Sequence, residues 1–471
     1  MISPLAFQCD SSVDPEPVTN WSGTHSTNLR VHYPTTTAEV EGLVAEANKN
    51  RKKLRPMGSH LSPNGLSFAD PNESVISLSL LDNILKIDTS KSTVTCQSGC
   101  RVSSVVDALR PHGLTLPQLA SIAEQQIGGF ISVAAHGTGH KIPTVDDFVD
   151  SFTVVTPALG TLTFSRSDVG MNKRMFDLIL VGLGLFGVIT EVTISCITAH
   201  NLLEHTFTLT REAAVQRLPQ LLATHKYVRY MWIPYTDTVV VVTNDPFDAS
   251  ASTLPTKMQT VPDVRDKLRP FTEMLLAHPG NGLSEEEVAG LGMGEVRDAL
   301  LALGPLDVAH VKRVNAVEAE FWKHATGYQY KPSDQLLQFD CGGSQWVQEN
   351  CFKVTDGEDM RFMTKLLVEI EARNIPAPSP IEQRWSAGSR SRMSPAAGAA
   401  GDVFSWVGII MYEGVARERS ELYPYSPCIH SRLVIPLFTP VFAGICRRTT
   451  ARRGQTSRLG SRARTGRCLR S

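Results

Sequence analysis

The sequence predicts an α+β protein with more than one domain, and three observations support this prediction. Its 471 residues are enough for two or three domains, and apolar (42%) and charged (20%) fractions are those of a globular protein. From residue 30 onward, short apolar strands alternate with amphipathic helices. From about residue 200 longer strands predominate, which indicates that a second region begins there.

The first region alternates strands and helices. Thr36 and Glu39 have the spacing of a capping box, in which each side chain satisfies a free backbone N–H at the start of a helix. Apolar residues follow at helical spacing from Val40 to Ala47 and predict a helix that packs on a sheet. The other predicted elements are strands at 29–33 and 53–57, a hairpin of 84–88 with 93–97, and a helix at 102–110.

In the second region, the clearest strands are 227–234 and 238–243, which flank a turn at 235–237. A further strand is predicted at 335–339, and residues 246–312 have the pattern of loop and helix. Residues 358–373 predict an amphipathic helix that ends before a proline-rich stretch.

The segment GLGLFG, residues 182–187, has the G-x-G-x-x-G spacing of a Rossmann dinucleotide site. Such a site needs a strand before the glycines and a helix after them, because the helix N-terminus holds the phosphates. Residues 177–181 are apolar and predict the strand, but residues 188–195 are β-branched and alternate with period two. We therefore favour a glycine corner between two strands over a Rossmann site, and we expect any dinucleotide to bind elsewhere.

Three polar or glycine-rich turns lie in the first 140 residues: PMGSHLSP at 56–63, EQQIGG at 124–129 and AHGTG at 135–139. Glycine permits close approach of the backbone, and successive turn N–H groups form concavities that bind anions. The three turns could together surround a pyrophosphate, although each alone could be an ordinary tight turn.

Charge and cysteine content exclude several classes of protein. The net charge is −1, and the Lys and Arg residues of the body are interspersed with Asp and Glu, so no nucleic-acid surface is expected. Nine cysteines without a CxxC pair predict free thiols and no metal site. No transmembrane helix is expected, and no targeting peptide is visible in MISPLAFQCDSSVDPEP.

Several blocks of sequence carry a family resemblance. They are NWSGTH (20–25), GSHLSPNG (58–65), GLTLPQLASIAEQQIGG (113–129), AAHGTGH (134–140), IPYTDTVVVVT (233–243), FDCGG (339–343), IEQRW (381–385) and FSWVGIIMY (404–412). These blocks closely resemble the aldonolactone oxidoreductases of the vanillyl-alcohol oxidase superfamily, and in particular the plant and algal dehydrogenases that make ascorbate. The resemblance extends from about residue 18 to residue 412.

The resemblance implies an α+β fold in which a vanillyl-alcohol oxidase or PCMH-type FAD-binding domain is followed by a mixed α/β substrate (cap) domain. The expected parts are an N-terminal extension (1–25), the FAD-binding domain (26–199), the aldonolactone cap domain (200–412) and an atypical basic tail (413–471).

The resemblance also implies where FAD binds. The pyrophosphate would be held by the backbone of the three turns, Ala120 would lie near the flavin C4a edge, and Val188 and Ile189 would lie beside the adenine. The expected cofactor-binding residues are Pro56, Gly58, Ser59, His60, Leu61, Ser62, Ala120, Ser121, Gln126, Gly128, Gly129, His136, Gly137, Thr138, Gly139, Val188 and Ile189.

Non-covalent FAD is expected. Covalent relatives attach the flavin to a histidine in the first turn, but Leu61 occupies the aligned position here, and His60 lies one residue earlier. Adjacent residues in an extended turn point to different sides, so His60 is expected to point away from the flavin.

Glu382 and Arg384 are the expected catalytic residues. They are two positions apart, so in an extended segment both face the same side. Spacing alone would also suit an ion pair between domains. The resemblance implies that they catalyse the oxidation of the C2–C3 unit of L-galactono-1,4-lactone to give L-ascorbate, with hydride passing to flavin N5 and cytochrome c as the electron acceptor. The carboxylate would assist proton removal, and the guanidinium would stabilise negative charge.

Two alternatives to this function remain open: an aldonolactone oxidase that uses oxygen, and an inactive flavin-binding variant. The second arises because the likeness ends at Tyr412. The last 30 residues contain nine Arg and no acidic residue, and residues 413–471 resemble the product of an altered reading frame or a retained intron. A basic tail that binds anionic membranes is the other interpretation. The resemblance implies a location in mitochondria, at the inner membrane or in the intermembrane space, with peripheral association with the inner membrane.

Overall fold

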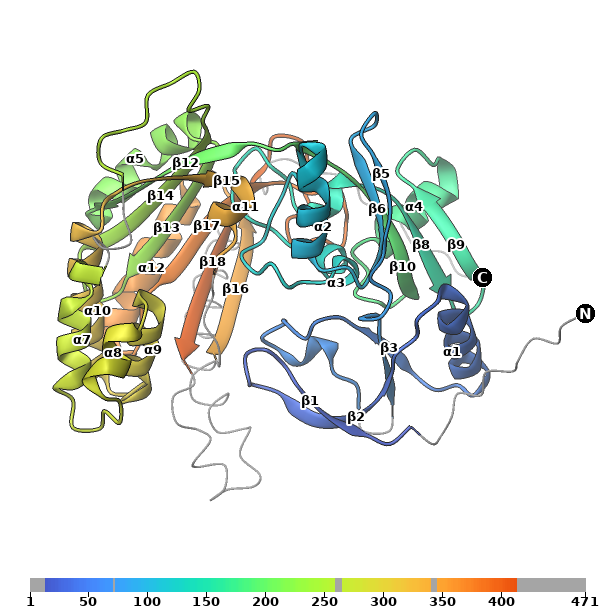
Figure 1. Cartoon of the computed structure of the whole chain (residues 1–471), viewed down its shortest axis with the longest axis horizontal. Coiled ribbons are helices and arrows are strands. Elements are labelled where there is room, and N and C mark those ends of the chain that lie inside the picture. Colours follow the sequence, from blue (N-terminus) through green and yellow to red (C-terminus); the bar gives the residue numbers. More distant parts are fainter. Residues whose placement is uncertain (1–12, 71–72, 259–264, 340–344, 413–471) are drawn as a thin grey trace, which may run out of the picture.

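The chain forms two lobes that face each other (Figure 1). The computed structural model describes residues 13–70, 73–258, 265–339 and 345–412. The expected basic tail at 413–471 lies outside the described residues, as do residues 1–12 of the expected N-terminal extension. The N-terminal lobe contains two main sheets, and the second lobe is built on one large sheet whose first strand in the sequence begins at Asn201.

The first sheet of the N-terminal lobe has the strand order β1-β2-β4-β3, with β1 antiparallel and the other pairs parallel. Its strands are β1 (Glu16–Thr19), β2 (Ser26–His32), β3 (Leu54–Met57) and β4 (Ser74–Ser77). Helix α1 (Thr37–Lys49) connects β2 to β3 and buries Val40 and Val44. Because these residues share a core cluster with Val155 and Val188, α1 packs between the two sheets of the lobe.

The start of α1 differs slightly from the predicted capping box. Thr36 accepts a hydrogen bond from the backbone N–H of Glu39, as predicted. The Glu39 carboxylate, however, accepts from the N–H of Thr35 at 2.6 Å, one residue before the N-cap. One more N–H at the helix start is still satisfied, so the effect on the helix is similar.

The second sheet of the N-terminal lobe is antiparallel, in the order β5-β6-β10-β8-β9. Helices α2 and α3 contribute buried residues to its core, and a two-stranded sheet of β7 and β11 lies beside it. The elements are β5 (Ile84–Asp88), β6 (Thr93–Gln97), α2 (Val102–Leu109), β7 (Leu114–Thr115), α3 (Ile127–Ser132), β8 (Val149–Thr156), β9 (Gly160–Ser165), α4 (Gly170–Ile179), β10 (Val188–Ser195) and β11 (Ile197–Thr198). The predicted hairpin of β5 and β6 and the predicted helix at α2 are confirmed.

The second lobe contains a seven-stranded antiparallel sheet in the order β15-β12-β14-β13-β17-β18-β16. Its strands are β12 (Asn201–Leu209), β13 (Tyr227–Ile233), β14 (Thr238–Pro246), β15 (Gly327–Pro332), β16 (Gln345–Lys353), β17 (Ile381–Ala387) and β18 (Val403–Tyr412). Its helices are α5 (Arg211–Thr224), α7 (Arg269–Leu276), α8 (Glu285–Gly290), α9 (Met293–Ala302), α10 (Val308–His324), α11 (Ser333–Leu337) and α12 (Glu358–Ala372). Helices α5 and α12 cover one face of the sheet and share a core with it. The predicted hairpin of β13 and β14 and the predicted helix at α12 are confirmed.

Two predicted strands are helical in the structure. Residues 177–181 form the end of α4 and the turn after it, where Phe176 and Leu180 are both buried and the Leu180 N–H donates to the Phe176 carbonyl. A short apolar run suits a buried helix as well as a buried strand, so the apolar pattern of these residues could not distinguish the two, and the predicted strand was wrong. Residues 335–339 lie mostly in α11, which begins directly after Pro332. A proline at the start of a helix is a known signal, but the prediction followed the alternation of side chains and gave a strand.

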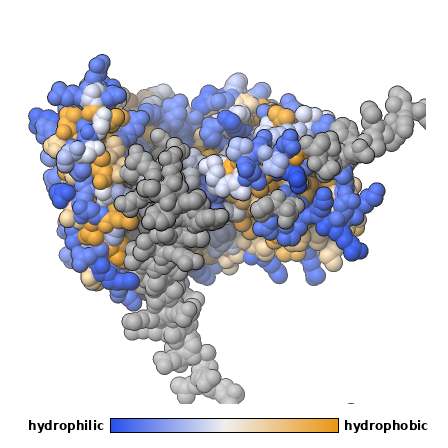
Figure 2. Space-filling view, turned by 90° about the horizontal axis from the view of Figure 1, so that it is seen from below, coloured by the Kyte–Doolittle hydropathy of each residue, from blue (hydrophilic) through white to orange (hydrophobic). Residues whose placement is uncertain are grey.

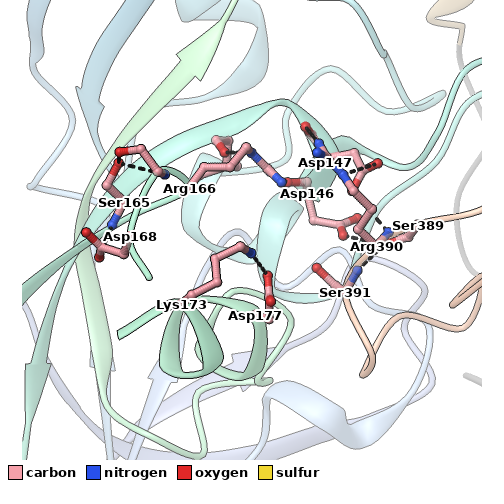
Figure 3. Close-up of polar contacts among 12 residues, drawn as sticks. Asp146, Asp147, Ser165, Arg166, Asp168, Lys173, Asp177, Ser389, Arg390 and Ser391 are labelled. Carbon is pink, nitrogen blue, oxygen red and sulfur yellow. Dashed lines mark hydrogen bonds and ion pairs between the residues drawn. The ribbon is translucent and has the colours of Figure 1, made fainter. Parts of the chain in front are cut away.

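Polar contacts join the two lobes just beyond β17 (Figure 3). Ser389 donates a hydrogen bond of 2.6 Å to the carboxylate of Asp146, and both residues are almost fully buried. The neighbouring Arg390 donates to the Asp147 carboxylate from its backbone N–H and from Nε, each at 3.1 Å. The lobes are therefore fixed to each other next to the strand that carries Glu382 and Arg384.

In the described residues, no helix combines the length and the apolar character needed to cross a bilayer. On the face shown in Figure 2, hydrophilic residues predominate and apolar side chains form separate groups.

Candidate active site

A cavity of about 590 Å³ lies between the lobes and is lined by both. The structure brings most of the expected site residues to it. Those that line the cavity are Pro56, Gly58, Ser59, His60, Leu61, Ser62, Ala120, Ser121, Gln126, Gly128, Gly129, His136, Ile189, Glu382 and Arg384.

Four expected cofactor-binding residues do not line the cavity: Gly137, Thr138, Gly139 and Val188. Two of them attach the N-terminal lobe to the large sheet instead, because Thr138 donates to the carbonyl of Val228 and the Gly139 N–H donates to the carbonyl of Trp385. Val188 is 3% exposed and belongs to the core around α1.

The glycine turns leave polar atoms pointing at the cavity. Ser98 Oγ, His60 Nδ1, Gln125 Oε1 and Gln126 Oε1 are buried and have no hydrogen-bond partner among the described residues, and all four residues line the cavity. A side chain at Gly128 would place its Cβ 2.9 Å from the Ser98 Cβ, so only glycine fits there. Buried polar atoms are normally satisfied, so these residues suit a large polar ligand such as FAD.

The segment 182–187 forms part of the cavity wall, although not as a Rossmann site. The strand β10 follows it directly, so the Rossmann helix is absent as expected, but α4 precedes it, and the predicted corner between two strands is instead a connection from a helix to a strand. Gly184 has a positive φ of 74°, and its Cβ would lie 2.3 Å from Pro56 Cγ, so this position requires glycine. Leu183 and Phe186 line the cavity together with Gly184.

The conformation of His60 differs from the expectation. His60 has a φ of 55°, so this residue is left-handed rather than extended, and the alternation of adjacent side chains does not apply. Both His60 and Leu61 line the cavity, and the His60 ring packs near Phe68 with centroids 5.9 Å apart. Burial lowers the pKa of His60, which favours the neutral imidazole.

Strand β17 positions the expected catalytic pair. Gln383 and Trp385 are fully buried, and Trp385 packs in the core with α5 and α12. Glu382 and Arg384 alternate with them along the strand and face the cavity. This confirms that the pair shares one side of an extended segment. Their side chains form an ion pair of 3.2 Å and are 15% and 13% exposed. Arg229 of β13 contacts the other Glu382 oxygen at 3.5 Å.

Arg384 also reaches the other lobe. Its Nη1 donates a hydrogen bond of 3.0 Å to the hydroxyl of Ser121. Ser121 follows Ala120, which is 8% exposed and lines the cavity. The expected catalytic pair and the expected C4a-edge segment therefore meet at one place in the cavity.

Glu349 was missed by the sequence reasoning. It lies on β16, contacts Arg384 Nη2 at 3.3 Å and His136 Nε2 at 3.0 Å, and lines the cavity. Desolvation alone would raise the pKa of its carboxyl, but the charge and hydrogen bonds of His136 and then of Arg384 outweigh desolvation and lower the pKa to about 2. A signal was present, because every second residue of β16 from Gln345 to Cys351 lines the cavity.

Comparisons with known proteins agree with this architecture. Residues 29–165 match the family described as FAD binding domain. A cholesterol oxidase from Brevibacterium sterolicum has a similar fold, with a TM-score of 0.67, 15% identity, and coverage of 85% of this chain and 80% of that chain. Together, fold and site define a flavoprotein oxidoreductase with a PCMH-type FAD-binding domain.

Similarity to curated proteins is more specific. L-galactono-1,4-lactone dehydrogenase 2 of Oryza sativa is 45% identical over 419 residues, which are 86% of this chain and 70% of that protein. The enzyme of the same name from Arabidopsis thaliana is 43% identical, over 86% of this chain and 68% of that protein. L-gulonolactone oxidase of Bos taurus is 30% identical over 50% of this chain and 53% of that protein. The chain belongs to the L-galactono-1,4-lactone dehydrogenase family and is an FAD-dependent aldonolactone oxidoreductase.

Proposed function

We propose that this protein oxidises L-galactono-1,4-lactone to L-ascorbate with non-covalent FAD and passes the electrons to cytochrome c. The observation that carries this proposal is the meeting of Glu382 and Arg384 with the Ala120–Ser121 segment at one cavity. The names of the rice and Arabidopsis relatives support the choice of lactone.

The residues of this chain have distinct roles in the proposed reaction. Bound FAD supplies a two-electron acceptor for a hydride from the lactone ring. Glu382 accepts a hydrogen bond from a ring hydroxyl at Oε1 or Oε2 and assists removal of its proton. Arg229 and Arg384 contact this carboxylate from two sides and orient it. The Arg384 guanidinium stabilises negative charge that develops in the cavity.

Non-covalent binding of FAD is supported by Leu61, which has no nucleophile and occupies the position of the flavin-linked histidine of covalent relatives. His60 also lines the cavity and is the histidine of this turn, so a test of non-covalent binding has to include His60.

Cytochrome c is favoured over oxygen because of Ala120. By family resemblance, dehydrogenases carry alanine at this position and relatives that use oxygen tend to carry glycine. The extra methyl group restricts space at the C4a edge, and close packing makes even one methyl significant. The similarity to bovine L-gulonolactone oxidase makes an oxygen-using oxidase the second candidate.

We also propose a mitochondrial location, at the inner membrane or in the intermembrane space, because the names of the rice and Arabidopsis relatives include the word mitochondrial. Peripheral association with the inner membrane is part of this proposal.

One experiment separates the candidate functions. Purified protein loaded with FAD is mixed with L-galactono-1,4-lactone, once with cytochrome c and once with oxygen as the only acceptor. We expect rapid bleaching of the flavin, fast turnover with cytochrome c and slow turnover with oxygen. Fast turnover with oxygen would identify an oxidase, and a flavin that is not reduced at all would identify an inactive variant.

A further inference from the structure

Four charged side chains and one histidine form a continuous series along the cavity wall. The order is Arg229, Glu382, Arg384, Glu349 and His136, and successive members lie 3.5, 3.2, 3.3 and 3.0 Å apart. Basic and acidic side chains alternate along the series, and four of the five residues line the cavity.

The register of the sheet explains how Glu349 reaches this series. On neighbouring strands, Glu382 and Glu349 both pair with Gly408 of β18, so the two carboxylates occupy one row. Since Gly408 has no side chain, nothing projects between them from β18, and the Arg384 guanidinium lies within 3.3 Å of both.

The contacts of the two ring nitrogens of His136 bear on how many protons the ring carries. Nδ1 lies 3.0 Å from the carbonyl oxygen of Gly137, and Nε2 lies 3.0 Å from a carboxylate oxygen of Glu349. A backbone carbonyl and an ionised carboxylate accept hydrogen bonds and do not donate them, so a ring that carries a proton on both nitrogens satisfies both contacts. The ring also stacks on Trp406 with centroids 3.7 Å apart and an interplanar angle of 11°, an arrangement that favours a cation.

The protonated ring changes the charge of the series. With His136 cationic, three cations face two anions, and one positive charge is in excess at the cavity wall. The groups that face the ring are Glu349 of β16 and Trp406 of β18, with Arg384 of β17 behind Glu349. Removal of the Glu349 charge would leave His136 without an anionic partner and Arg384 with one fewer contact.

We propose that Glu349 is a positioning residue that keeps His136 doubly protonated and orients Arg384, so that the cavity wall keeps an excess positive charge. The effect on catalysis rests on the proposed function, because the excess charge would stabilise the negative charge gained by FAD on reduction. The protonation of His136 does not depend on any substrate.

The direct test is ¹⁵N NMR of the histidine rings in the FAD-loaded protein, with the His136 signals assigned by their loss in His136→Gln. At about pH 8, where an ordinary histidine is neutral, we expect two protonated ring nitrogens in the wild type. Glu349→Gln should show one, and Glu349→Asp should keep two because it retains the charge. A neutral His136 in the wild type, or a doubly protonated one in Glu349→Gln, would overturn the proposal.

The kinetic test measures flavin reduction by L-galactono-1,4-lactone between about pH 6 and pH 8.5, a range that spans an ordinary histidine pKa. We expect the rate of Glu349→Gln, divided by the wild-type rate, to fall with rising pH by a factor on the order of 10, since the variant loses the His136 charge. This decline should be absent from Glu349→Asp, which keeps the charge, and from the double variant that combines Glu349→Gln with His136→Gln. A ratio that does not change with pH would contradict the kinetic part of the proposal.

Glu371→Gln is the matched control. Glu371 is similarly exposed (32% against 31%) and pairs with Arg211 at 2.5 Å, but it is not among the residues that line the cavity. This variant should keep the wild-type rate and pH dependence. If the wild type fails to oxidise the lactone while the ¹⁵N NMR of His136 and of the Glu349 variants is as expected, the proposed function is wrong and the assignment of Glu349 stands.

Discussion

Arg384 donates a hydrogen bond of 3.0 Å from Nη1 to the hydroxyl of Ser121, across the boundary between the two lobes. One residue thus connects β17 to the segment that contains Ala120. The same guanidinium contacts Glu382 and Glu349, so its position depends on both lobes.

The first prediction concerns the catalytic pair. Glu382→Gln and Arg384→Ala should each lower the rate of flavin reduction by a factor on the order of 10² or more, as expected when a group that acts in the transition state is lost. Stopped-flow measurement of flavin bleaching gives the rate, and the flavin absorbance shows whether FAD is still bound. A near-normal rate in either variant with bound FAD would show that the assignment is wrong.

The second prediction concerns the bond to the cofactor. Acid precipitation should release the flavin into the supernatant, because Leu61 offers no nucleophile. His60→Ala is the control, because His60 is the histidine of this turn that lines the cavity. If the wild-type pellet stays yellow and the His60→Ala pellet does not, FAD is covalently bound to His60.

The third prediction concerns the electron acceptor. Ala120→Gly should raise the rate at which oxygen reoxidises the reduced protein, because a methyl group is removed from a close-packed wall. Reduction by the lactone and turnover with cytochrome c should change little. Rapid reoxidation of the wild type in air, or a glycine variant no faster than the wild type, would count against the idea.

The fourth prediction concerns the contacts between the lobes. Ser389→Ala should lower the free energy of unfolding by about 1–3 kcal/mol, because the buried carboxylate of Asp146 loses a donor. Ser250→Ala removes a serine–aspartate hydrogen bond of the same 2.6 Å length at an exposed site, so it should change stability by less than about 0.5 kcal/mol. Urea unfolding of both variants would measure the difference. Equal effects would show that the buried contact adds nothing.

The sequence was sufficient for features that depend on local spacing. The common side of Glu382 and Arg384 follows from the two-residue period of a strand, and the rejection of a Rossmann helix follows from the β-branched residues of β10. Local spacing failed at 177–181, where a short apolar run fits either a strand or a helix.

The role of Glu349 could not be derived from its own segment. Strand β16 precedes β17 and β18 in the chain, but it pairs at the far side of β18, and only this sheet order places Glu349 beside Arg384. The contact with His136 further requires the packing of one lobe on the other. These relations are non-local, so side-chain alternation in β16 could mark Glu349 as facing the cavity but could not name its partners.

The backbone bonds between residues 139–142 and β17 bear on how substrate enters. The Gly139 N–H donates to the Trp385 carbonyl at 2.7 Å, and the Ala387 N–H donates to the Ile142 carbonyl at 3.0 Å, so a loop of the N-terminal lobe runs beside the catalytic strand. A hinge motion that separated the lobes at this point would break both bonds. These two backbone bonds therefore oppose any motion that would widen the cavity by separating the lobes beside β17.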